Sequence, residues 1–173
     1  MIVEQCMSKS PRACTPADTL AAAARLLWDH DLGALPVVDQ AGAVVGMITD
    51  RDLCMAAYTS GLSLHACLVG RHTSRTVFSI GAKSDTAKAA ELMKSRKVRR
   101  LPVVENGRLV GMLTLTDLAR RARALPPAEV AALLADVAAP RTPAAAAPVA
   151  LAAGSRKVKS LLKAKPRTLA KKR

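Results

Sequence analysis

Two segments of this 173-residue chain repeat one pattern, and this repeat constrains the fold more than any other feature. Residues 18–53 read "DTLAAAARLLWDHDLGALPVVDQAGAVVGMITDRDL", and residues 84–118 read "SDTAKAAELMKSRKVRRLPVVENGRLVGMLTLTDL". The two "LPVV" motifs are 66 residues apart, whereas Thr49 and Thr114 are 65 apart. The difference falls between "DQAG" and "ENG", where we expect a turn, because turns tolerate changes of length. The chain is therefore expected to fold as two copies of one unit.

Each copy predicts a helix, two strands joined by a hairpin turn, and a second helix. Apolar residues recur at helical spacing from Leu20 to Leu27. The runs "ALPVV" and "AVVGMIT" flank Gly42, which is typical of a hairpin, and Asn106-Gly107 suits a tight turn with positive φ. The runs "TDRDLCMAAY" and "TLTDLARRARA" each predict a helix, and the short extended runs "RACTP" and "TVFSI" precede the first helix of each copy.

A single copy of about 60 residues would bury only a marginal core, so we expect the two copies to pack through their sheets with pseudo-two-fold symmetry. The predicted class is mixed α and β (α/β or α+β), with the order β-α-β-β-α in each repeat. The predicted parts are a first repeat within residues 1–60, a second repeat within 61–124, a short amphipathic helix within 125–140, and a disordered tail from 141 to 173.

The positive charge is concentrated at the C-terminus. Residues 141–173 hold ten Lys and Arg and no acid, whereas residues 1–140 have a net charge of +4. An Ala-, Pro- and Lys-rich stretch without acids predicts an extended cationic tail. Such a tail could bind DNA or RNA through phosphates, bind anionic lipid, or only keep the protein in solution; we favour contact with a polyanion. The residues expected to make it are Arg156, Lys157, Lys159, Lys163, Lys165, Arg167, Lys171, Lys172 and Arg173.

Several other classes of protein lack support in the sequence. The start "MIVEQCM" does not resemble a signal peptide, and the longest apolar run of the tail has ten residues and contains Pro148, so no transmembrane segment is expected. The four cysteines do not form Cys-x-x-Cys pairs, which favours free, mostly buried thiols in the cytoplasm. His65, Cys67 and His72 lack a fourth ligand, and we predict no metal site.

Catalytic motifs are also missing from the sequence. It contains no G-x-x-x-x-G-K-[ST], G-x-S-x-G or H-E-x-x-H. We therefore expect a protein that is not an enzyme and requires no cofactor.

The pattern Thr-x-x-Asp follows the second strand of each copy, as Thr49 with Asp52 and as Thr114 with Asp117. This pattern is typical of a capping box, in which the Thr begins a helix and the acid bonds back to it. A carboxylate can also accept hydrogen bonds from two neighbouring ribose hydroxyls, and a helix N-terminus can offer N–H groups to a phosphate. The two interpretations stay open, and both roles can coexist.

The segments "LGALPVVDQAGAVVGMITDRDL" and "VRRLPVVENGRLVGMLTLTDL" resemble the cores of two cystathionine-β-synthase (CBS) domains, a pair of which is called a Bateman module. The resemblance covers roughly residues 1–124. It implies two β-α-β-β-α units that form flat homodimers and regulate a partner, here unknown. It also implies that AMP, ADP, ATP or S-adenosylmethionine binds as a regulatory ligand in clefts between the repeats.

The same resemblance assigns roles by position. Asp52 and Asp117 would accept from ribose hydroxyls, and Thr49 and Thr114 would donate toward phosphate or ribose. Residues just before "LPVV" would shape the adenine and phosphate pocket. The implied ligand-binding set is Gly33, Ala34, Pro36, Thr49, Arg51, Asp52, Arg99, Arg100, Pro102, Thr114 and Asp117.

The two copies differ at the positions that would meet a phosphate. The second copy has Arg99-Arg100 where the first has Gly33-Ala34, and the first has Arg51 inside its motif. The two clefts are therefore expected to be unequal. Two hypotheses follow: a non-catalytic sensor of an adenosine-containing ligand, or a structural dimer that presents a basic tail to nucleic acid.

Overall fold

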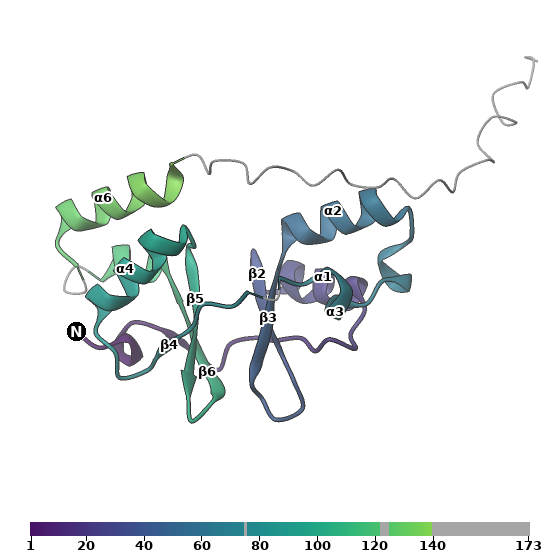
Figure 1. Cartoon of the computed structure of the whole chain (residues 1–173), viewed down its shortest axis with the longest axis horizontal. Helices are drawn as coiled ribbons and strands as arrows, with labels where there is room; N and C mark the ends of the chain where they lie inside the picture. The colour runs from purple at the N-terminus through teal and green to yellow at the C-terminus, as the bar shows by residue number, and fades with distance from the viewer. Residues whose placement is uncertain (75, 122–124, 140–173) are drawn as a thin grey trace, which may run out of the picture. The chain divides into compact units, whose positions relative to one another are not determined.

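The computed structural model describes residues 1–74, 76–121 and 125–139 (Figure 1). The first repeat and the segment before it contain the 3-10 helix η1 (Val3–Gln5), β1 (Ser8–Lys9), α1 (Leu20–Asp29), β2 (Ala34–Val38), β3 (Val44–Thr49) and α2 (Asp50–Ser60). The remaining elements are the 3-10 helix η2 (Leu64–Ala66), α3 (Val69–His72), β4 (Ile80–Gly81), α4 (Thr86–Arg96), β5 (Arg100–Glu105), β6 (Arg108–Thr114), α5 (Leu115–Arg120) and α6 (Pro127–Ala138).

Local side-chain chemistry sets the turns and the starts of the helices. The Thr19 hydroxyl oxygen accepts from the backbone N–H of Ala22 at 3.2 Å and caps α1. The turn between β5 and β6 has φ of 50° at Asn106 and 77° at Gly107, which confirms the predicted tight turn. The predicted helix after β6 is shorter than expected: α5 ends at Arg120, because Arg121 has left the helical conformation (φ −100°, ψ 89°).

The strands form two sheets in the described part of the chain. Strands β2 and β3 pair as an antiparallel hairpin, and the other sheet has the order β1-β6-β5-β4, with β4 parallel to β5. The hairpins repeat each other closely, since each has a register irregularity, after Val37 in one and after Val103 in the other. The predicted mixed α and β fold with two similar repeats is thus confirmed.

The segment that leads into each repeat packs with the other repeat. Strand β1 pairs with β6 of the second repeat, and Ser74 makes the corresponding backbone pair with Met47 of the first. Val3 lies in the core of the second repeat, while Val69 lies in the core of the first. This exchange holds the two repeats together, because neither core is complete without a segment that adjoins the other repeat.

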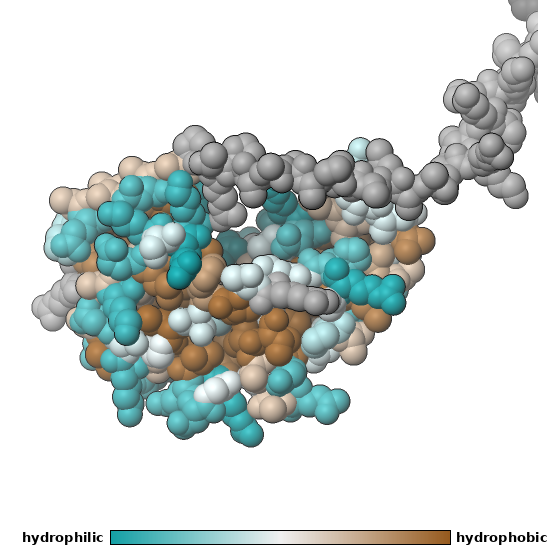
Figure 2. Space-filling model, viewed as in Figure 1, coloured by the Kyte–Doolittle hydropathy of each residue, from teal (hydrophilic) through white to brown (hydrophobic). Residues whose placement is uncertain are grey.

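Each repeat has its own hydrophobic core between its strands and its helices. The first core centres on Leu20, Leu35, Val37, Ile48 and Leu53, and the second on Met93, Leu101, Val103, Leu113 and Leu118. Hydrophobic surface gathers toward the middle of the face in Figure 2, where the two hairpins lie in Figure 1, while hydrophilic side chains occupy much of the periphery.

Helix α6 packs on the second repeat, against α4 and α5. Leu133 and Val137 are buried in the second core, and Asp136 pairs with Lys94 of α4 at 3.2 Å. Pro127 is the first residue of the helix, where its missing N–H costs nothing. No helix in the described part of the chain combines the length and hydropathy that a bilayer crossing requires. The predicted basic tail lies outside the described residues.

Candidate functional site

The Thr-x-x-Asp motifs form the same capping box at the start of α2 and of α5. In the first, Oδ2 of Asp52 accepts from the Thr49 backbone N–H at 2.9 Å and from its hydroxyl at 2.7 Å. In the second, Oδ2 of Asp117 accepts from the same two groups of Thr114 at 2.8 and 2.7 Å. Each Thr hydroxyl oxygen accepts in turn from the Asp backbone N–H. The interpretation that both motifs begin a helix is confirmed.

The capping box leaves one carboxylate oxygen of each aspartate unused. Oδ1 of Asp52 and Oδ1 of Asp117 accept no hydrogen bond from any described residue. Both carboxylates are half-buried, so this oxygen is the part of the motif that can receive a ligand hydroxyl. The threonine hydroxyl has already donated its single proton to Oδ2. A phosphate would therefore need other donors.

Such donors stand at the start of β5. Arg100 is paired with Thr114 across the hairpin, and the Leu115 backbone N–H donates to the Arg99 carbonyl oxygen at 2.9 Å. Neither guanidinium group forms an ion pair or a hydrogen bond with any described residue. Two arginine side chains therefore lie beside the second capping box with their donors unused, which suits a bidentate acceptor such as phosphate.

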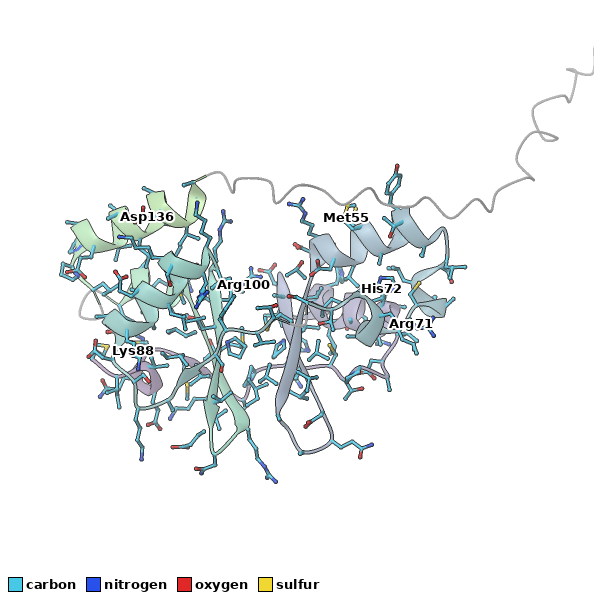
Figure 3. The ribbon with its side chains drawn as sticks, in the orientation of Figure 1. Met55, Arg71, His72, Lys88, Arg100 and Asp136 are labelled. Carbon is cyan, nitrogen blue, oxygen red and sulfur yellow. The ribbon has the colours of Figure 1, made fainter. Side chains whose placement is uncertain are left out.

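Arg100 also explains a glycine of the first repeat. A Cβ added to Gly33 would lie 2.7 Å from Nη2 of Arg100, so the guanidinium occupies the space that a side chain would need. Arg100 is labelled in Figure 3, on the side of the second repeat that faces the first. The predicted residues Gly33 and Arg100 are thus brought together from different repeats.

A hollow of about 520 Å³ contains the predicted residues Arg99, Arg100 and Thr114. Its other lining residues were not predicted from the sequence. These are Leu115, Thr116 and Ala119 of α5, and Leu134, Val137 and Ala138 of α6. A signal existed in the sequence, because Leu134 and Ala138 are four residues apart and form a second row beside Leu133 and Val137.

The predicted residues of the first repeat do not line this hollow, and neither do Pro102 and Asp117 of the second. Thr49 is paired with Ala34 across the β2–β3 hairpin, as Thr114 is with Arg100, but Ala34 brings no charge. Arg51 is exposed on α2. Pro36 and Pro102 are buried within their strands and can contribute shape only.

The two repeats also differ in charge. Residues 1–60 hold four Lys and Arg against seven Asp and Glu, a net charge of −3, whereas residues 61–124 hold 13 against four, a net charge of +9. An anionic ligand is therefore attracted to the second repeat more strongly than to the first.

A further hollow, of about 410 Å³, lies along β4 and α4 and holds none of the predicted ligand-binding residues. It is lined by Ser79, Ile80, Gly81, Ser84, Lys88, Glu91, Leu92 and Ser95.

The four cysteines are free, three of them are buried and Cys54 is exposed, which agrees with the expected thiols. Burial raises the pKa of the Cys14 thiol to about 11 and also raises the pKa of Cys6. Cys67 lies in the first core, with its sulfur 3.6 Å from the Ser60 hydroxyl oxygen.

Among residues 1–74, 76–121 and 125–139, no three His, Cys, Asp or Glu side chains gather as a metal site would require.

Two pseudo-symmetric repeats with capped Thr-x-x-Asp corners define a tandem domain pair. The CBS domain family model matches residues 3–58 and 69–124, more than half of the chain, and the chain therefore belongs to the CBS-domain family. Hypoxic response protein 1 of Mycobacterium tuberculosis is 34% identical over 103 residues, which cover 60% of this chain and 72% of that protein.

Solved structures show the same fold. A crystal structure of hypoxic response protein I with two coordinated zinc ions has a TM-score of 0.65 at 30% identity, covering 70% of this chain and 98% of that one. The CBS domain pair of protein MJ0100, solved with 5′-methylthioadenosine and S-adenosyl-L-methionine, has a TM-score of 0.62 at 26% identity (69% and 94% covered). CBSX2 in complex with AMP has a TM-score of 0.62 at 27% identity (70% and 96% covered).

Proposed function

We propose that this CBS domain pair is a non-catalytic regulatory module that binds an adenine nucleotide, with the second repeat providing the principal site. The observation that supports it most is the pair of unpartnered arginines, Arg99 and Arg100, in the hollow beside the Thr114–Asp117 capping box. The arginines bind the phosphate, and Oδ1 of Asp117 accepts from the ribose. The similar proteins solved with AMP or with S-adenosylmethionine support a ligand of this class.

The charge of the site favours AMP, ADP or ATP over S-adenosylmethionine. Two guanidinium groups attract phosphate, whereas they repel the sulfonium cation of S-adenosylmethionine at close range. In this proposal the ligand is regulatory, no catalytic cofactor is required, and the regulated partner is a separate protein. The free, largely buried thiols support a place in the cytoplasm.

The test compares Asp117→Asn with Asp52→Asn by isothermal titration calorimetry with AMP, ADP, ATP and S-adenosylmethionine. The two substitutions damage the same capping box in different repeats, so each is a control for the other's effect on stability. We expect Asp117→Asn to weaken nucleotide binding about tenfold or more, and Asp52→Asn to leave it nearly unchanged. Arg100→Gln should weaken binding as Asp117→Asn does.

Two results would contradict this proposal. If none of the four compounds binds the wild-type protein at millimolar concentration, the sensor function is wrong. If Asp52→Asn loses binding and Asp117→Asn does not, the first repeat is the site.

We also propose a second function for the C-terminal segment. Ten Lys and Arg without an acid after residue 140 support non-specific binding of nucleic acid through phosphates. A fluorescence titration with double-stranded DNA should show that the full chain binds with a steep dependence on salt, and that a 1–140 truncation loses most of this binding. Equal affinity of the two proteins would remove the segment from this role.

A further inference from the structure

Helix α6 is held on the second repeat by one row of its side chains. Leu133 and Val137 are 4% and 7% exposed and belong to the second core, and Val130 packs against it. The ion pair between Asp136 and Lys94 joins the helix to α4; Figure 3 labels Asp136 on α6. The position of α6 is therefore set by contacts with the core and with α4, of which only Val137 also lines the hollow.

A neighbouring row of α6 side chains faces the hollow. Leu134 and Ala138, four residues apart, line it together with Val137. Leu134 remains 48% exposed although the helix is docked, so its apolar surface is available to another molecule. The lining that comes from β5, the residue before it, β6 and α5 includes Arg99, Arg100, Thr114 and Thr116. The hollow thus has a cationic, polar side and an aliphatic side, and its volume suits a small-molecule ligand.

The corresponding surface of the first repeat carries different side chains. The positions that correspond to Thr116 and Ala119 in the sequence repeat are Arg51 and Cys54 on α2. Helix α2 contacts α1, η2 and α3, and the elements that follow it, η2 and α3, are short, whereas α6 has 12 residues. The two sites therefore differ in the helices that surround them, through α6, as well as in their charge.

We infer that α6 is a ligand-contacting wall of the second site, and this inference rests on the proposed function. The phosphate of the nucleotide lies on Arg99 and Arg100, and the purine packs on Leu134 and Ala138. A ligand that touches α6 only when the helix is docked stabilises the docked position. Nucleotide binding in the hollow is thereby coupled to α6, the helix that precedes the basic segment after residue 140.

Two matched substitutions test this wall in the full-length chain, with AMP and ATP as probes. Ala138→Leu replaces a methyl that lines the hollow by an isobutyl group, whereas Ala131→Leu makes the same replacement at an exposed position of α6 that does not line it. We expect Ala138→Leu to weaken nucleotide binding about tenfold or more, and Ala131→Leu to change it less than about twofold. Leu134→Ala, which removes part of the wall, should also weaken binding.

A second measurement follows the helix itself. Hydrogen–deuterium exchange of residues 127–138 should slow when AMP or ATP is added to the wild-type protein, because binding favours the docked helix. One result would overturn the wall and leave the proposed function standing. In it, the wild type binds nucleotide, Ala138→Leu and Ala131→Leu bind with the same affinity as each other, and hydrogen–deuterium exchange does not change. Faster exchange on binding would also overturn it, since the ligand would then displace α6. Absence of nucleotide binding by the wild type would overturn both.

Discussion

At the scale of single residues, the two oxygens of the aspartate in each Thr-x-x-Asp motif have different roles. Oδ2 of Asp117 is committed to Thr114, while Oδ1 is left for a ligand. This division is why a capping residue and a ribose-binding residue can be the same side chain. Because Thr114 donates its only proton to Asp117, its role toward a phosphate is positioning, and the arginines must supply the charge-assisted donors.

The buried thiol of Cys14 makes the stability of the first repeat depend on pH in the alkaline range. Burial raises its pKa to about 11 from an ordinary value of 9.0. Between these values the unfolded chain has lost the proton and the folded chain still holds it, so stability falls as the pH rises. Below the lower value both states hold the proton, and the thiol then contributes no dependence on pH.

This dependence can be measured by urea unfolding of the wild type and of Cys14→Ala from pH 8 to pH 11. Cys14→Ala leaves a small cavity and should be less stable than the wild type at pH 8. The difference between their free energies of unfolding should narrow by about 2 kcal/mol toward pH 11. All other titrating groups are common to the two proteins and cancel in the difference. A gap that stays constant over the whole range would contradict the assigned pKa.

At the scale of secondary structure elements, the hairpins and helix starts could be predicted from sequence because their determinants are local. Asn106-Gly107 and the two Thr-x-x-Asp motifs act within four residues, so their patterns indicate the turn and the helix start directly. Arg99, Arg100 and Thr114 are placed in one site by the family resemblance, and the register of the β5–β6 hairpin pairs Arg100 with Thr114.

The rest depends on contacts between distant segments, which no local pattern encodes. The pairing of β1 with β6, and of Ser74 with Met47, joins segments from different repeats. A repeat boundary predicted from the sequence pattern alone places the two partners of each pair in separate repeats. Helix α6 shows the same limit. Its spacing predicts an apolar face, but only the packed structure divides that face between the core, through Leu133, and the hollow, through Leu134.

At the scale of the whole molecule, the two outer helices that follow the hairpins differ in how they are covered. Helix α5 packs against α6, whereas α2 leaves Met55 46% exposed and Tyr58 78% exposed at neighbouring positions of one face. Met55 is labelled on α2 in Figure 3. Together with the homodimer that the family resemblance implies, this apolar face supports the proposal that α2 packs against α2 of a second copy.

On this proposal, a charge introduced on the α2 face weakens self-association. Tyr58→Lys replaces an aromatic contact by an ammonium group that the interface would have to bury, so we expect its dimer dissociation constant to rise about tenfold or more over the wild type. Trp28→Lys is the matched control, because Trp28 is an aromatic residue 87% exposed on a different helix, α1. Sedimentation velocity over a concentration series measures both variants. A wild type that stays monomeric, or a control that dissociates as readily as Tyr58→Lys, would show that α2 does not form the interface.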